Sequence, residues 1–147
     1  MSFKFERLRV WKLSLDYIDQ VYSIVNQLPN DEKYNLSSQI KRAATSIALN
    51  IAEGSTGQSD AEQARFLGMA QRSLIETVAC IKIIERKKFV EETEIKDLLS
   101  CSENLAIKIQ AMRKAVLNNK NQSSEDINFY QSNVEDDRTQ TTDNRKT

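Results

Sequence analysis

Residues 34–54 read YNLSSQIKRAATSIALNIAEG, and this stretch decides the fold. Its apolar residues recur every three or four positions, which is the spacing of one buried face on an α-helix. That face consists of Leu36, Ile40, Ala43, Ala44, Ile47 and Ile51. We expect the helix to end at Glu53 and Gly54, because glycine tolerates the left-handed backbone conformation that commonly terminates a helix.

Three further segments show the same helical spacing. The segment before the quoted stretch carries its inward stripe at Leu8, Trp11, Leu15, Ile18, Tyr22 and Val25. The segment from residue 59 to about residue 87 carries it at Phe66, Leu67, Ala70, Leu74, Thr77, Val78, Ile81 and Ile84. The last segment carries it at Ile95, Leu98, Leu99, Leu105, Ala106, Ile109, Met112 and Val116. The sequence therefore predicts four amphipathic helices, the last beginning near Thr93 and ending after Leu117.

Turn and capping residues separate these helices. Pro29 and the polar residues after it end the first helix. Ser59 and Glu62 have the spacing of a capping box, in which a hydroxyl and a carboxylate satisfy free amides at a helix start. With only 3 Gly and 1 Pro, the chain lacks the tight turns of an all-β fold. Four helices with short connections predict an all-α fold, an antiparallel up-down-up-down four-helix bundle.

The composition changes after residue 117. Residues 118–147 are rich in Asn, Gln, Ser, Thr and Asp, and almost their only apolar residues are Ile127, Phe129, Tyr130 and Val134. Such a segment buries too little apolar surface to offset the entropy that ordering costs. We therefore expect two parts, a four-helix bundle over residues 1–117 and a polar, disordered C-terminal tail over residues 118–147.

The composition also excludes several classes of function. The chain has no histidine, which removes Ser-His-Asp and Cys-His nucleophile pairs and His-bearing metal sites. It carries 21 Lys and Arg against 21 Asp and Glu, and this zero net charge argues against a uniformly basic coat for nucleic acid. No Gly-rich phosphate loop of the known type occurs. We expect no enzyme activity, no catalytic residues, no cofactor, no metal and no small-molecule substrate.

A cytoplasmic location is expected. No run of 18 apolar residues occurs, and the N-terminus interleaves charges with aromatic residues, so neither a membrane span nor a signal segment is indicated. Cys80 and Cys101 would lie at the same height on the third and fourth helices, where a disulfide is geometrically feasible. Two reduced thiols are the alternative that a cytoplasmic compartment favours.

A second, polar stripe borders the buried face of the helix over residues 36–54. It consists of Gln39, Arg42, Ser46, Asn50 and Glu53. Amides and arginine suit hydrogen-bonded contacts with another subunit or a ligand, whereas the alternative is an ordinary solvated flank. Leu49, Ile75 and Ile107 point away from the predicted buried faces, either as single exposed residues or as parts of an oligomer surface. Together these residues form the candidate subunit interface.

The antiparallel order of the helices sorts the charges between the two ends of the bundle. The end at which the first and third helices begin has an excess of positive charge, and the opposite end has an excess of negative charge. The candidate nucleic-acid-binding residues at the positive end are Lys4, Arg7, Arg9, Lys12, Lys108, Arg113 and Lys114. Their field would attract the phosphates of RNA or DNA.

The quoted stretch, with its QI-RAA-SI-NIAEG core, resembles the four-helix bundle family encoded in intervening sequences of 23S rRNA genes. The resemblance covers about residues 3–117 and includes Trp11, Tyr22, Pro29, Leu74 and Glu76. It implies an up-down bundle that assembles as a ring of five subunits. It extends to the accessory variability determinant of diversity-generating retroelements, which is a pentameric, basic, nucleic-acid-binding partner of a reverse transcriptase.

Two functions therefore remain as expectations. The first is a bacterial, non-enzymatic scaffold or adaptor that self-assembles as a homopentamer. The second is a nucleic-acid-binding accessory factor that partners a reverse transcriptase through the positive end of the bundle. Residues 55–58 read STGQ where basic residues often follow the NIAEG motif of the family, which weakens the second role at that loop.

Overall fold

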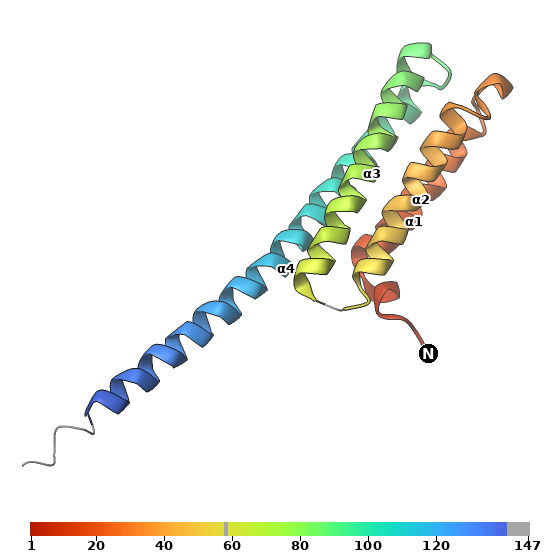
Figure 1. Ribbon diagram of the computed structural model, residues 1–147. Coiled ribbons are helices and arrows are strands. Elements are labelled where there is room, and N and C mark those ends of the chain that lie inside the picture. The colour runs from red at the N-terminus through yellow and green to blue at the C-terminus, as the bar shows by residue number, and fades with distance from the viewer. Residues whose placement is uncertain (58, 141–147) are drawn as a thin grey trace, which may run out of the picture.

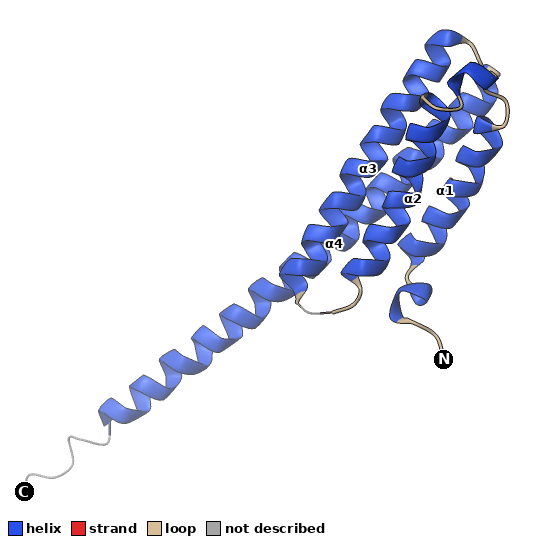
Figure 2. Ribbon diagram, turned by 45° about the vertical axis from the view of Figure 1, so that its right-hand side comes forward, coloured by secondary structure: helices blue, strands red, loops and turns tan. Residues whose placement is uncertain are grey.

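The computed structural model describes residues 1–57 and 59–140, with side chains as far as Asn119. Its elements are η1 (Lys4–Arg7), α1 (Arg9–Val25), η2 (Asn30–Glu32), α2 (Leu36–Gly54), α3 (Asp60–Lys87) and α4 (Glu92–Gln140). The α-helices run side by side in alternating directions (Figure 1), and α1 contacts α4 to close the bundle. No strand occurs within the described ranges (Figure 2). The predicted all-α, antiparallel four-helix bundle is confirmed.

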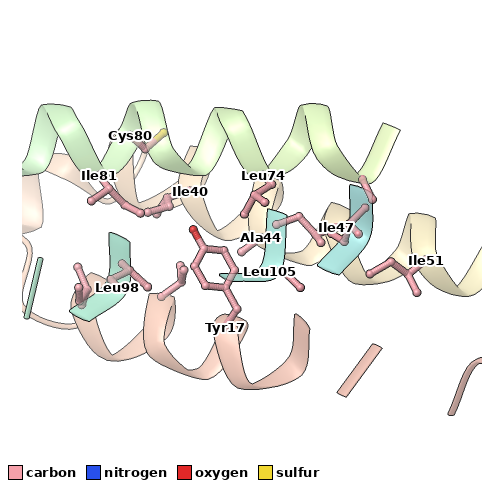
Figure 3. Close-up of a cluster of buried hydrophobic side chains, with 14 of the residues drawn as sticks. Tyr17, Ile40, Ala44, Ile47, Ile51, Leu74, Cys80, Ile81, Leu98 and Leu105 are labelled. Atoms are coloured by element: carbon pink, nitrogen blue, oxygen red, sulfur yellow. The ribbon is translucent and has the colours of Figure 1, made fainter. Parts of the chain in front are cut away.

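The hydrophobic core follows the axis that the helices share, and Figure 3 shows its middle part. Every residue predicted for the inward face of α2 is buried. In α3 and α4 most predicted residues are buried, and Phe66, Val78, Leu99, Ala106 and Met112 are partly buried at the edges. The helical spacing therefore predicted the inward faces of α2, α3 and α4 correctly.

The inward face of α1 differs from the predicted stripe. Its buried residues are Val10, Ser14, Tyr17, Val21, Ile24 and Val25. Leu15 and Tyr22, which were predicted to be buried, are 40% and 44% exposed. The true face precedes the predicted one by a single residue, which is a rotation of about 100° around the helix axis. The prediction was wrong for Leu15 and Tyr22.

Two hydroxyl groups explain why the true face of α1 looked polar in the sequence. Ser14 Oγ donates a hydrogen bond to the Trp11 carbonyl oxygen at 2.6 Å. The Tyr17 hydroxyl lies 2.7 Å from Thr77 Oγ1, across the core on α3. Because both hydroxyls have partners, burying them costs little. Spacing alone cannot reveal a partner that comes from another helix.

The helices α2 and α3 approach each other closely at Gly54. A Cβ atom at position 54 would lie 2.8 Å from Phe66 Cβ, which is too short for any carbon–carbon contact. Gly54 is the last residue of α2, and the residues with positive φ in the described chain are Gly57 and Lys88. The left-handed conformation predicted for Gly54 is therefore wrong, because glycine is needed there for the close approach.

The boundaries of α3 and α4 follow their capping residues. Ser59 Oγ accepts a hydrogen bond from the Glu62 backbone N–H at 3.1 Å, as the predicted cap requires. Lys88 ends α3 in the left-handed conformation, with φ of 57°. The helix α4 starts at Glu92 and continues to Gln140, past the end that we predicted near Leu117.

The part of α4 beyond residue 117 extends away from the other three helices (Figure 1). Val116 is the last core residue among the described side chains. The segment after it leaves the core, in agreement with the small apolar content from which we predicted that it buries little surface. Backbone hydrogen bonds within the helix do not need a packing partner. Residues 141–147 lie outside the described residues, and the disorder of the tail stays a prediction.

Candidate functional site

The polar stripe of α2 divides into an inner and an outer part. Ser46 Oγ lies 2.9 Å from Ser73 Oγ of α3. Asn50 Nδ2 donates to the Ser46 carbonyl oxygen at 2.8 Å and to Ser46 Oγ at 3.1 Å. These inner residues join α2 to α3 within one chain, whereas Gln39, Arg42 and Glu53 are exposed. The outer residues are therefore the most accessible to a second molecule, while Ser46 is partly exposed in the groove beside Leu49.

Leu49 and Ile107, two of the three apolar residues of the candidate interface, line different grooves of the bundle. Leu49 is 54% exposed on α2, Ile75 is 69% exposed on α3, and Ile107 is 61% exposed on α4. Leu49 lines a groove with Tyr22 of α1, and Ile107 lines a groove between α3 and α4. The structure does not bring the three residues into a single patch.

The groove between α1 and α2 contains a feature that the sequence reasoning missed. Lys41 Nζ lies 5.0 Å from the centroid of the Tyr22 ring, a cation–π contact on the molecular surface. Thr45 and Leu49 continue the groove along α2. Tyr22 was assigned to the core, so its exposure was not foreseen. The sequence of α1 allows two neighbouring inward stripes, and this ambiguity was the signal that Tyr22 could be exposed.

The candidate nucleic-acid-binding residues gather at one end of the bundle. η1 and the start of α1 carry Lys4, Arg7, Arg9 and Lys12, and α4 carries Lys108, Arg113 and Lys114. The N-terminus lies at the end of the bundle from which α4 emerges (Figure 2). The ion pairs of the described side chains are Arg65–Glu62, Lys82–Glu85 and Lys96–Glu92, and none of them involves these residues.

Aromatic rings hold η1 against the start of α1. The Phe5 and Trp11 rings meet edge to face with centroids 4.6 Å apart. The Phe3 and Phe5 rings stack with centroids 6.0 Å apart, and Phe3 is 64% exposed. Such contacts fix the direction of the chain at the N-terminus. They place Lys4 and Arg7 near the beginning of α1.

Buried hydroxyl groups form a polar layer inside the core. Thr77 Oγ1 donates to the Leu74 carbonyl oxygen at 2.6 Å while it contacts the Tyr17 hydroxyl, and Ser102 Oγ donates to the Leu99 carbonyl oxygen at 2.7 Å. Burial raises the pKa of Tyr17 to about 12. Tyr17 is therefore neutral near pH 7, and its hydroxyl contributes a hydrogen bond between α1 and α3.

Both cysteines are free thiols. Cys80 is buried, and burial raises the pKa of its thiol, with a smaller contribution from the charge of Glu76. Cys101 is partly exposed and accepts a hydrogen bond from Gln20 Nε2 at 3.2 Å. The structure therefore contains the reduced pair rather than the disulfide. A raised pKa keeps Cys80 protonated and unreactive.

The described residues lack two further kinds of site. They contain no group of three or more His, Cys, Asp or Glu side chains arranged to hold a metal ion. Within the same residues, no helix has both the length and the apolar character that crossing a membrane requires. The candidate sites of the described chain are therefore surface features. They are the exposed apolar side chains on several helices and the basic end of the bundle.

Fold and surface together define a helical-bundle protein whose candidate sites are interaction surfaces. The family model of the 23S rRNA-intervening sequence protein matches residues 6–111. The chain belongs to this family, and the resemblance found in the sequence is confirmed.

A solved structure supports the fold of this family. The chain is similar to a protein of unknown function from the S23 ribosomal protein family of Bacteroides thetaiotaomicron, with a TM-score of 0.66 and 24% sequence identity. The match covers 71% of this chain and 95% of that chain. Comparison with curated proteins finds no match. This likeness concerns the fold alone.

Proposed function

We propose that this chain is a non-enzymatic, self-assembling scaffold or adaptor that forms a ring of five subunits. The observation that carries the proposal is the exposure of Leu49, Ile75 and Ile107, three large apolar side chains on three helices. Covering one such side chain is favourable by about 1.5–3 kcal/mol. A ring needs two different surfaces on each subunit, and the α1–α2 and α3–α4 grooves supply two.

Sedimentation velocity tests the assembly. The unmodified protein should sediment as a species of five times the 16.9 kDa mass of one chain. Leu49→Glu, Ile75→Glu and Ile107→Glu should each shift it toward the monomer, because a charge would be buried in the interface. Ile83→Glu is the matched control, since Ile83 is 47% exposed and lies outside the candidate interface. A protein that stays monomeric at all concentrations would contradict the proposal.

The unpaired basic residues favour a second candidate function, a nucleic-acid-binding accessory factor. A reverse transcriptase as its partner is what the family resemblance implies. Lys4, Arg7, Arg9, Lys12, Lys108 and Lys114 form no ion pair with any described residue. Their charge is therefore open to phosphate groups. The aromatic rings beside them could stack on unpaired bases.

Binding of a labelled single-stranded RNA at several salt concentrations tests this second function. Affinity should fall steeply with salt, because each neutralised phosphate releases a counterion. Replacing Lys4, Arg7 and Arg9 together by Gln should weaken binding and flatten the salt dependence. Replacing Lys82, Arg86 and Lys87 by Gln removes the same charge at the opposite end and serves as the control. No binding at low salt would leave the scaffold as the only candidate.

A further inference from the structure

A glycine on α3 supports an arginine from α4. A Cβ atom at position 68 would lie 3.4 Å from Arg113 Nε and 3.6 Å from its Cζ and Nη2, so the guanidinium lies directly over Gly68. Arg113 Nε also donates to the Ala64 carbonyl oxygen at 3.0 Å. The guanidinium is thus held in one place without a carboxylate partner among the described residues.

The outer donors of this guanidinium remain available. Nε is the nitrogen of Arg113 that the described residues engage in a hydrogen bond. Arg113 is partly exposed, and its Nη1 and Nη2 form no hydrogen bond with a described residue. A planar fork of N–H groups in a fixed position matches two oxygens of a phosphate group.

Two further cations flank the guanidinium. Arg72 follows Gly68 by one turn of α3, and helical side chains lean toward the N-terminus, which directs Arg72 over the turn that contains Gly68. Lys114 follows Arg113 on α4 and lines a shallow groove with Gln71 and Gln110. Neither Arg72 nor Lys114 forms an ion pair with a described residue.

Glu76 is the carboxylate nearest to these cations along α3, one helical turn from Arg72, and the two form no ion pair. Other carboxylates of α3 and α4 are more distant or paired. Asp60 precedes Gly68 by two helical turns, a rise of about 12 Å. Glu103 precedes Arg113 by nearly three turns, a rise of about 15 Å. Glu62 is nearer but pairs with Arg65, at 3.9 Å. The three cations Arg72, Arg113 and Lys114 therefore outnumber the unpaired carboxylate nearest to them, and the local charge around Gly68 is positive.

We propose that Gly68, Arg72, Arg113 and Lys114, together the Gly68 patch, form a binding site for a phosphate group. The phosphate is either part of a nucleic-acid backbone or a free phosphate ion. The nucleic-acid source rests on the second candidate function above, whereas the free ion does not. Arg113 is the central residue of the patch because its orientation is fixed before the ligand arrives.

Two probes distinguish the sources, a short labelled single-stranded RNA and inorganic phosphate. Arg113→Gln, Arg72→Gln and Lys114→Gln should each weaken binding, Arg113→Gln by about tenfold through the loss of charge-assisted hydrogen bonds. The salt slope for RNA should fall by about one for each cation removed. Arg86→Gln is the matched control, because it removes one exposed cation from the other end of α3.

Substitutions at Gly68 separate the fixed geometry from the charge. Gly68→Ala adds a Cβ at ordinary contact distance from the guanidinium and should retain binding. Gly68→Leu keeps every charge but crowds Arg113 away from Ala64, and should weaken binding as Arg113→Gln does. Far-ultraviolet circular dichroism should show the same helix content in both variants.

The outcomes distinguish a failure of the Gly68 patch from a failure of the nucleic-acid-binding function. RNA binding that Arg113→Gln and Gly68→Leu leave unchanged would overturn the Gly68 patch while the second candidate function stands. Phosphate binding that both variants weaken, in a protein that does not bind RNA, would support the patch and remove the nucleic-acid function. A protein that binds neither probe at low salt would overturn both.

Discussion

The hydroxyl of Tyr17 decides which face of α1 is buried. The side chain is 2% exposed, and its hydroxyl reaches Thr77 on α3 at 2.7 Å. The stripe predicted from the sequence does not include this tyrosine, and its hydroxyl partner lies 60 positions further along the chain. Arg113 is similar, since its sequence position suggests a free surface cation and its contact with Ala64 becomes visible only in the folded chain.

The titration of Tyr17 gives a prediction at this scale. The pKa of Tyr17 is about 12 in the folded protein, against an ordinary value of 10.0. Between these values the unfolded chain loses a proton that the folded chain keeps, so the free energy of unfolding should fall as the pH rises from about 10 to about 12. The decrease due to Tyr17 should be of order 2 kcal/mol.

Urea denaturation at a series of pH values checks this prediction against the variant Tyr17→Phe. At pH 7 the variant should be less stable by about 0.5–1.5 kcal/mol, because a buried hydrogen bond is lost. Above pH 10 the difference should shrink and then reverse. Equal pH dependence in both proteins would show that Tyr17 is not the group responsible.

At the scale of the element, the helices differ in how fully their sequence determines their packing. Every residue predicted for the inward face of α2 is buried, because its apolar residues form one continuous stripe, although Ser37, Ala48 and Asn50 are buried as well. The helix α1 has two apolar stripes, and its packing against α2 and α4, together with the hydroxyl contact to Thr77 of α3, selects one of them. For Gly54 the position was predicted but the reason was not, since the close approach of Phe66 depends on α3.

The two helical glycines give a matched prediction. Gly54→Ala should lower the free energy of unfolding by about 1–3 kcal/mol, because the new Cβ would lie 2.8 Å from Phe66 Cβ and the helices must separate. Gly68→Ala should be neutral or stabilising by up to about 1 kcal/mol, since its Cβ has room and alanine favours the helix. Thermal unfolding of both variants checks the pair, and equal effects would contradict it.

At the scale of the whole molecule, the fold class could be predicted from four periodic segments and their caps. The arrangement of the candidate site residues could be predicted only in part. Leu49, Ile75 and Ile107 were correctly placed outside the core, yet the separation of Leu49 and Ile107 into two grooves depends on how the helices pack. The inner part of the polar stripe, Ser46 and Asn50, turned out to join α2 to α3. Sequence periodicity predicts the face of the helix on which a residue lies. It does not predict which residue of another helix that side chain contacts.

Truncation tests where the stabilising core ends. A chain of residues 1–117 should keep the stability of the full chain, because Val116 is the last described residue of the core. A chain of residues 1–109 lacks Met112, Arg113 and Val116 and should lose several kcal/mol. Urea denaturation followed by circular dichroism measures both. A large loss on removing residues 118–147 would contradict this division of the chain.

The buried hydroxyls of Tyr17, Thr77 and Ser102 have a consequence for how the chain reaches its fold. Aliphatic residues dominate the remaining core and would tolerate a helix that slides by one turn. A slide of α1 or α3 would leave the Tyr17 hydroxyl against hydrocarbon, at a cost of about 1–3 kcal/mol. The hydroxyl layer therefore favours the correct alignment of α1 and α3. It destabilises bundles in which either helix has slid by one turn.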